Sequence, residues 1–308
     1  MRKEIKIGTR ASLLAVTQST WVKEQIEKQH PGTTVELVKI TTKGDKILDV
    51  PLAKVGGKGL FVKEIEDALL DGRADLAVHS MKDVPTDLPD RLHLAIVTER
   101  ENPQDAFISS KYKDVLDLPQ GATVGTSSLR RKSQLACLRP DLTIEDLRGN
   151  LDTRLRKLDE GKYDAIILAA AGLNRLGMSE RITSLFNPSQ MLPAIGQGAL
   201  GLELRRDDAE LLEGIFFLNH PRTATAVNAE RAFLLRLEGG CQVPIGAFAT
   251  ADETQVTLTG LIASVDGKEI LKEVVSGPAE NAAELGTELA EKLLGMGGRQ
   301  ILDEVYGE

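Results

Sequence analysis

The sequence predicts an α/β protein in which two similar doubly wound domains lie around a cleft, followed by a small α+β domain with an antiparallel sheet. Strand–turn–helix segments with related residues begin at residues 4 and 122, which indicates a repeated unit. After His220 the pattern changes to short alternating strands joined by an Asp266-Gly267 turn. A chain of 308 residues is long enough for two or three domains.

The elements of the first domain follow from hydrophobic periodicity and from the residues that end helices. In order, they are a strand at residues 4–7, a helix after the turn at 8–12, a strand at 33–40, a helix at 61–72 and a buried strand at 74–80. In the first helix, Leu14, Trp21, Val22 and Ile26 fall on one broad face. Gly72 closes the second helix, because glycine readily adopts the left-handed conformation found at helix ends.

The second domain repeats this plan. Its predicted elements are a strand, turn and helix over residues 122–138, a helix at 151–161 and a buried strand at 163–173. Segments rich in helix breakers, at 99–105 and 187–198, mark the joins, and the strand-like residues 199–205 are expected to return the chain to the first domain. We therefore expect domain 1 to hold residues 1–98 plus 199–217, and domain 2 to hold residues 104–193.

The third domain is expected over residues 221–308. Its predicted elements are a helix at 223–237, strands at 254–265 and 269–277, and a final helix from about 279 to 294. This domain carries the acidic surface, since residues 248–308 contain 12 acidic and 4 basic side chains.

Charge and composition narrow the class of ligand. The chain has a net charge of −8, yet residues 121–175 hold 7 Arg and 3 Lys against 7 acids. An acidic protein with an arginine-rich segment is a poor candidate for nonspecific nucleic-acid binding and a better one for a small anionic ligand. Two cysteines form no disulfide framework, and the apolar runs are too short for a membrane span. We expect a cytoplasmic protein.

The residue patterns argue against a metal site. The four histidines are scattered, and neither a Cys-x-x-Cys nor a His-x-x-x-His pattern occurs. The glycine-rich "GGKG" of residues 56–59 does not match a phosphate-binding loop, because Gly59 stands where Ser or Thr is needed. The long segment at 41–61 that contains it is typical of a functional lid.

The turns "GTRAS" (8–12) and "GTSSLRR" (125–131) place hydroxyls and arginines where a strand gives way to a helix. The free N–H groups of a helix N-terminus favour anions, and Arg130 and Arg131 add paired donors suited to carboxylates. Single helical arginines are often solvated surface, but Arg148, Arg154 and Arg175 cluster with this pair in the predicted domain. Five arginines together indicate a ligand with several carboxylates or phosphates.

The stretch "VHSMKDVP" (78–85) brings polar side chains to the carboxyl end of a buried strand. We interpret His79 as a structural histidine. Asp83 is a candidate acid/base group, and its carboxylate is also able to stabilise a developing cation.

Cys241 stands in "EGGCQVP" (238–244), directly after a predicted helix C-terminus. That helix end disfavours a thiolate, and no local pattern ties a histidine to the sulfur. We therefore interpret Cys241 as an attachment point for a reactive electrophile and not as a turnover nucleophile.

Taken in order, "GTRAS", "VHSMKDVP", "GTSSLRR", "LRGN" with "TR", "LPAIGQGALGLE" and "EGGCQVP" resemble the porphobilinogen deaminase family, also called hydroxymethylbilane synthase. The resemblance covers essentially the whole chain. It implies a periplasmic-binding-protein-like arrangement of the first two domains. The short C-terminal domain is similar to that of bacterial members, which lack the insertion of animal members.

The resemblance implies a transferase of haem biosynthesis that condenses four porphobilinogens into hydroxymethylbilane with loss of ammonia. It implies a dipyrromethane cofactor bound through a thioether to Cys241, with Asp83 as the catalytic residue. It further implies a monomer that needs no metal, membrane or nucleic acid. The cofactor- and substrate-binding residues it implies are Arg10, Ser12, Gln18, Lys54, Lys58, Ser80, Lys82, Thr126, Ser127, Ser128, Arg130, Arg131, Arg148, Asn150, Arg154, Arg175 and Gln197.

Two other function classes fit parts of the sequence. A non-catalytic binding module also has two α/β domains around a cleft and binds anions, but the sequence has neither an export signal nor a defensible helix-turn-helix. A thiol-dependent hydrolase or transferase is the weaker alternative, because nothing local activates Cys241.

Overall fold

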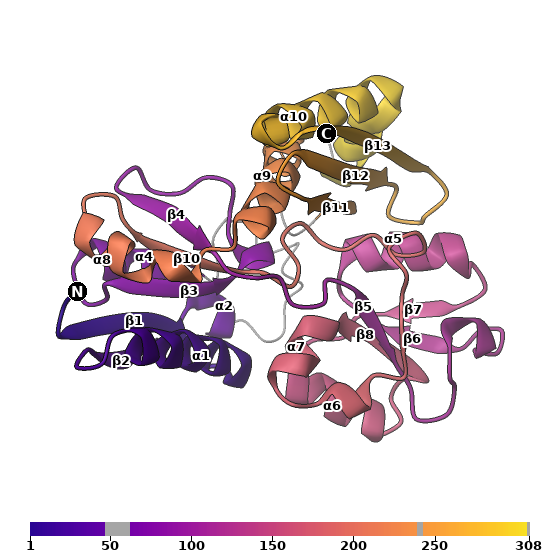
Figure 1. Cartoon of the computed structure of the whole chain (residues 1–308). Helices are drawn as coiled ribbons and strands as arrows, with labels where there is room; N and C mark the ends of the chain where they lie inside the picture. Colours follow the sequence, from indigo (N-terminus) through magenta and orange to yellow (C-terminus); the bar gives the residue numbers. More distant parts are fainter. Residues whose placement is uncertain (47–61, 239–242, 307–308) are drawn as a thin grey trace. The chain divides into compact units, whose positions relative to one another are not determined.

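A computed structural model describes residues 1–46, 62–238 and 243–306. The chain forms two compact units (Figure 1). Unit 1 comprises residues 1–100 and 199–224, and unit 2 comprises residues 101–198 and 225–308. No helix among the described residues is long and apolar enough to cross a membrane.

Unit 1 contains a five-stranded sheet. Its order is β2 (Thr34–Ile40), β1 (Glu4–Arg10), β3 (Leu76–Ser80), β10 (Leu200–Arg205) and β4 (Leu92–Val97). Strand β1 pairs in parallel with both of its neighbours, whereas β10 runs antiparallel to both β3 and β4. The segment after residue 199 therefore returns to the first sheet, as predicted.

Helices cover both faces of this sheet. Apolar side chains of α1 (Leu13–Gln29) and α8 (Ala209–Ile215) pack on one face, and those of α4 (Lys63–Leu70) pack on the other. In α1, Val22 and Ile26 are fully buried, but the Trp21 side chain is 41% exposed. The broad apolar face predicted for this helix therefore enters the core only in part. A short helix, α2 (Lys43–Lys46), and two 3-10 turns, η1 (Met81–Asp83) and η4 (Phe216–Leu218), complete the unit.

The first sheet of unit 2 repeats the plan of unit 1. Its order is β7 (Thr143–Glu145), β6 (Thr123–Gly125), β8 (Ala165–Ala169), β5 (Asp105–Ile108) and β9 (Ser184–Leu185). Again the first three strands are parallel, and a strand that follows a connection between the units, β5, pairs antiparallel to β8. The prediction of two similar α/β domains is confirmed.

The predicted strand at 163–173 is wrong over its second half, where α7 (Ala170–Arg175) begins. The partner strand β5 starts at Asp105, opposite Ala169, so the chain has no ladder to continue beyond that point. On this sheet α5 (Leu129–Leu138) covers one face, while α6 (Leu151–Asp159) and α7 cover the other (Figure 1). Two 3-10 turns, η2 (Val115–Asp117) and η3 (Ser179–Arg181), lie in the connections.

Unit 2 also holds the antiparallel sheet expected near the C-terminus. The sheet has three strands, in the order β11 (Ile245–Ala251), β12 (Gln255–Ala263) and β13 (Ile270–Pro278). Its core includes side chains of α9 (Pro221–Arg236), α10 (Ala282–Leu293) and α11 (Arg299–Tyr306). Helix α10 follows the 3-10 turn η5 (Ala279–Asn281), and the wider turn η6 (Leu294–Gly298) leads into α11. The sequence did not predict β11, because "IGAFATA" is rich in small residues with weak strand propensity.

Candidate active site

Unit 1 brings several predicted site residues to the carboxyl ends of β1 and β3. These two strands pair in parallel, so they end at the same edge of the sheet. Ser12 caps α1 by accepting a hydrogen bond from the Ala15 N–H at 3.4 Å. Gln18, which is buried, donates from Nε2 to the Ser80 hydroxyl at 3.0 Å. Arg10, at the end of β1, is half-buried.

Asp83 lies on the turn that directly follows β3. Met81 and Val84 are buried on either side of it, and the Met81 N–H donates to the Ala199 carbonyl at 3.0 Å. These anchors turn Lys82 and Asp83 outward, so that Lys82 is half-buried and Asp83 is exposed. The carboxylate of Asp83 is therefore accessible at the end of a strand whose other side chains are largely buried.

His79 is a structural residue, as the sequence indicated. Its Nε2 lies 2.8 Å from the Oε2 atom of Glu203 on β10, and both side chains are buried. The pairing gives the imidazole a partner inside the sheet layer.

Unit 2 assembles its predicted residues at the carboxyl ends of three parallel strands. The turn at 126–128 follows β6, the segment 146–150 follows β7, and α7 with Arg175 follows β8. The Thr126 N–H donates to the Glu145 carbonyl at 2.9 Å, and the Ser127 hydroxyl donates to the Leu147 carbonyl at 3.0 Å. Ser128 is the N-cap of α5 and accepts from the Arg131 N–H at 3.5 Å.

Arg130 and Arg131 are not solvated: they are 4% and 5% exposed and surround the fully buried Asp105. Arg131 donates to Oδ1 of Asp105 from Nε at 3.0 Å and from Nη2 at 2.7 Å. Arg130 donates to Oδ2 from Nη1 at 2.7 Å and also to the Leu192 carbonyl at 2.7 Å. The sequence missed Asp105, because a single aspartate after a turn carries no signal of which distant arginines it meets.

The charges in this cluster do not cancel. Burial alone would raise the pKa of Asp105, but Arg130 and Arg131 hold it well below its ordinary value, so the carboxylate is ionised. Burial lowers the pKa of Arg130, an effect that Asp105 opposes and Arg131 reinforces. In the described part of the chain, Nε of Arg130 is buried without a hydrogen-bond partner. One carboxylate between two guanidiniums leaves one positive charge, which an anionic group could offset.

Gln197 joins the same network, and Arg175 bonds to the residue that follows Gln197. Gln197 is buried and donates from Nε2 to Oδ1 of Asp105 at 2.9 Å and to the Pro103 carbonyl at 2.6 Å. Arg175 donates to the Gly198 carbonyl at 2.6 Å, and burial lowers the pKa of its guanidinium while Glu101 opposes that effect.

The remaining predicted residues of unit 2 lie at the start of α6. Arg148 and Arg154 are half-buried, and Arg154 donates from Nε to the Gly149 carbonyl at 2.7 Å. Asn150 occupies the N-cap position but makes no side-chain capping bond. Among the described residues, no group of three or more His, Cys, Asp or Glu side chains is arranged to hold a metal ion.

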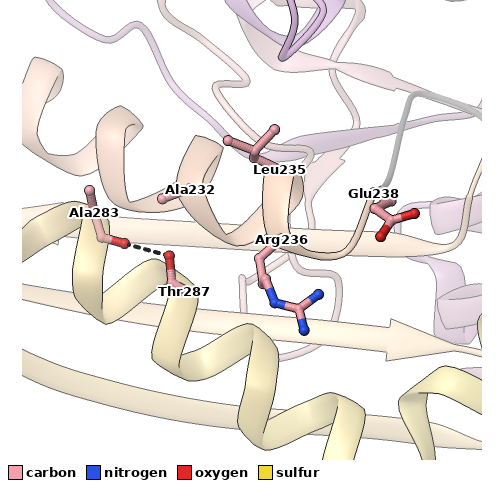
Figure 2. A pocket seen from close by; sticks show the side chains of 6 residues that line it. All are labelled: Ala232, Leu235, Arg236, Glu238, Ala283 and Thr287. Carbon is pink, nitrogen blue, oxygen red and sulfur yellow. Dashed lines mark hydrogen bonds between the residues drawn. The ribbon is translucent and has the colours of Figure 1, made fainter.

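Cys241, Lys54 and Lys58 lie outside the described residues. The residues on either side of the cysteine segment, up to 238 and from 243, are described. Leu237 and Val243 are buried in one hydrophobic core, and Glu238 adopts a left-handed conformation with φ of 55° at the end of α9. Figure 2 shows Arg236 and Glu238 lining a pocket of about 390 Å³ beside Thr287 of α10. The left-handed residue confirms that the helix ends before Cys241.

Comparison with known proteins decides the family. A family model described as "Porphobilinogen deaminase, dipyromethane cofactor binding domain" matches residues 5–213, and one described as "Porphobilinogen deaminase, C-terminal domain" matches residues 224–295. The porphobilinogen deaminase of Trichlorobacter lovleyi is 59% identical over 304 residues, which cover 99% of this chain and 97% of that relative. The chain belongs to the porphobilinogen deaminase family.

A second relative supports the same family. The porphobilinogen deaminase of Geobacter sulfurreducens is 60% identical over 302 residues, covering 98% of this chain and 95% of the relative. Among solved structures, the methionine binding protein MetQ aligns with 70% of this chain and 89% of its own length, at 15% identity and a TM-score of 0.46. As a family member, the chain is a transferase of tetrapyrrole biosynthesis and uses a dipyrromethane cofactor. The activity and cofactor implied by the sequence motifs are confirmed.

Proposed function

We propose that this chain joins four porphobilinogen molecules head to tail, releases one ammonia for each, and so forms hydroxymethylbilane. The observation that carries the proposal is the surplus positive charge of Arg130 and Arg131 around Asp105. Each porphobilinogen ring bears an acetate and a propionate, so a growing chain needs many cationic partners. Charge-assisted hydrogen bonds of this kind contribute about 1.5–3 kcal/mol each.

The carboxylate-binding role is proposed for residues in both units. In unit 1 they are Arg10, Ser12, Gln18, Ser80 and Lys82, together with Lys54 and Lys58. In unit 2 they are Thr126, Ser127, Ser128, Arg130, Arg131, Arg148, Asn150, Arg154, Arg175 and Gln197. Most of the members that the structure describes lie after the carboxyl ends of parallel strands, which supports this role because ligands of open α/β sheets bind at that edge.

Cys241 is proposed to hold the dipyrromethane cofactor through a thioether. When bound, the cofactor supplies the pyrrole end to which the first substrate unit is joined. The flanking residues Leu237 and Val243 are buried and Ile245 begins a strand, so the described ends of this segment are fixed in the core. Such anchoring supports a tether, because it limits where the sulfur can lie.

Asp83 is proposed as the catalytic residue. Loss of ammonia leaves the substrate as an electron-poor methylene-pyrrolenine cation, and an accessible carboxylate stabilises such a cation. The same carboxylate accepts a proton during each condensation. General acid–base help contributes about 10²–10⁴-fold, and electrostatic stabilisation adds to it. Exposure of Asp83 on η1 supports this role.

We also infer the setting in which the enzyme works. It acts as a cytoplasmic monomer, without a metal, a membrane or nucleic acid, and residues 104–193 and 221–308 form separate domains. The scarcity of cysteines supports a reducing compartment, and the net charge of −8 argues against nucleic-acid binding. Separate hydrophobic clusters in the two segments support the domain division.

The test is an Asp83→Asn variant, which keeps the shape of the side chain and removes its charge. We expect kcat to fall by about 10²–10⁴-fold while the protein still carries its cofactor. Asp90→Asn is the matched control, because Asp90 is also exposed and follows in the same loop. Near-normal turnover of Asp83→Asn would show that Asp83 is not the catalytic residue.

A further inference from the structure

Asp105 is the centre of the polar cluster in unit 2. Its two carboxylate oxygens accept four hydrogen bonds, two from Arg131, one from Arg130 and one from Gln197, at 2.7–3.0 Å. In the part of the chain that the structure describes, it is the one carboxylate that contacts either guanidinium. Its own side chain is fully buried, so it does not reach a ligand itself.

Two buried guanidiniums repel each other, and the repulsion is strong where water is excluded. The Asp105 carboxylate offsets this repulsion because it bonds to both at once. Backbone carbonyls then fix the direction of each side chain, with Leu192 accepting from Arg130 at 2.7 Å and Ile167 accepting from Arg131 at 3.1 Å. The result is a pair of arginines held in one geometry with one positive charge left over.

The cluster also involves both segments where the chain passes between the units. Asp105 is the first residue of β5, just after the crossing at residue 101, and Gln197 lies just before the crossing back at residue 199. Gln197 bonds to Asp105 and to the Pro103 carbonyl, so it joins the two segments. The joins that the sequence indicated as linkers are therefore part of the scaffold of the arginine pair.

We propose that Asp105 is a positioning residue that sets the arginine pair for the carboxylates of substrate and cofactor, with Gln197 supporting it. The inference rests on the proposed function, because it takes Arg130 and Arg131 as ligand-binding residues. Loss of the Asp105 charge leaves two uncompensated guanidiniums, which separate and no longer present one fixed geometry to a ring carboxylate.

The principal test is Asp105→Asn, which keeps the size of the side chain and removes its charge. We expect the KM for porphobilinogen to rise at least about tenfold, with a smaller change in kcat. Cofactor-free protein incubated with porphobilinogen should also gain the two-pyrrole adduct more slowly, which intact-protein mass measures directly. A purely structural role would lower the melting temperature while leaving KM and adduct formation of the folded protein unchanged, and that result would overturn the proposal.

Asp141→Asn is the matched control. Asp141 pairs with Arg139, the C-cap of α5, through two hydrogen bonds of 2.7–2.8 Å, so the variant breaks an Asp–Arg pair at the opposite end of the same helix. We expect its KM and adduct formation to equal those of the parent. A rise in KM equal to that of Asp105→Asn would mean that any loss of an ion pair from α5 has this effect, which contradicts the proposal.

Gln197→Met keeps the proposal testable if Asp105→Asn does not fold. It removes one hydrogen bond to Asp105 and leaves the ion pairs in place, so KM should rise about threefold. Parent-like behaviour of the only folded variant would overturn the proposal. Arg131→Leu separates this inference from the proposed function: if it impairs binding and Asp105→Asn does not, only the positioning role fails. If Arg131→Leu itself binds substrate like the parent, the proposed arginine binding site is wrong, and the positioning role that depends on it is wrong as well.

Discussion

Asp83 and Asp105 are two aspartates in opposite environments: Asp83 is exposed on η1, whereas Asp105 is fully buried between two arginines. Asp83 is the third residue after the buried apolar strand β3, so it lies at the edge where ligands of α/β sheets bind. Asp105 owes its importance to Arg130 and Arg131, about 25 residues away in sequence. Only the pairing of β5 with β8 brings these residues together, and no local pattern encodes that pairing.

Arg148 provides the prediction at the scale of a single residue. It follows the carboxyl end of β7, and it belongs to the proposed carboxylate-binding set. We expect Arg148→Leu to raise the KM for porphobilinogen about tenfold or to slow cofactor assembly, since a charge-assisted hydrogen bond is lost. Steady-state kinetics and the intact mass of freshly assembled protein measure the two effects.

Arg156→Leu is the control for Arg148→Leu. Its side chain is 67% exposed on α6 and forms an ion pair with Glu160, and exposed pairs contribute little to stability. Should both arginine variants match the parent, the anion-binding role of this edge would be wrong.

At the scale of elements, the layer between α4 and the sheet of unit 1 contains a buried titratable cluster. Glu66 of α4 is 9% exposed, and it lies near the His79–Glu203 pair of β3 and β10. Burial raises the pKa of Glu66 from 4.5 to about 7, and Glu203, Asp67 and Asp87 add to the rise, while His79 opposes it. Glu66 is therefore protonated in the folded protein under conditions where it would be ionised in the unfolded chain.

This cluster predicts how stability depends on pH. Because the folded pKa of Glu66 lies above the unfolded value, its protonated form favours folding below about pH 4.5, and that contribution is lost as the pH rises to about 7. Gln does not ionise, so Glu66→Gln should not lose this stability as the pH rises. At pH 8 its free energy of unfolding should exceed that of the parent by about 1–3 kcal/mol. Urea unfolding at pH 4.5 and pH 8 measures the difference.

Asp67→Asn is the control on the same helix, because Asp67 is the exposed neighbour of Glu66. It should leave the pH dependence almost unchanged. An equal loss of stability between the two pH values in the parent and in Glu66→Gln would show that Glu66 does not titrate as described.

Element boundaries also show what local sequence leaves open. The helix starts at Ser12 and Ser128 and the glycines that close helices were predicted because their chemistry is local. The predicted turn at 8–12 is wrong over residues 8–10, where β1 continues because it pairs with β2 as far as Arg10. The end of β8 was not predicted, since it is set by the first residue of its antiparallel partner β5. Strand β11 was not predicted. Its small residues are stabilised by pairing with β12 and by burial, and its own sequence indicates neither.

At the scale of the whole molecule, the internal repeat made the architecture predictable. Two sheets with matching strand orders follow from two similar strings of elements, and the return of β10 was readable from the strand-like residues after 199. Contacts between elements that are far apart in the sequence could not be predicted from it. Gly267 was predicted as a turn residue, yet a Cβ there would lie 2.3 Å from the Ser133 carbonyl of α5. The turn between β12 and β13 thus packs against the helix that carries Arg130 and Arg131.

We propose that the chain works through a covalent two-pyrrole cofactor on Cys241, with charge recognition by arginines and catalysis by Asp83. Intact-protein mass of the active enzyme tests it most directly, with Cys241→Ser as the comparison. We predict that the parent is heavier than its sequence by two pyrrole units and that Cys241→Ser has the mass of its sequence and no activity. An unmodified mass from fully active protein, or a two-pyrrole adduct that persists in Cys241→Ser, would contradict the account.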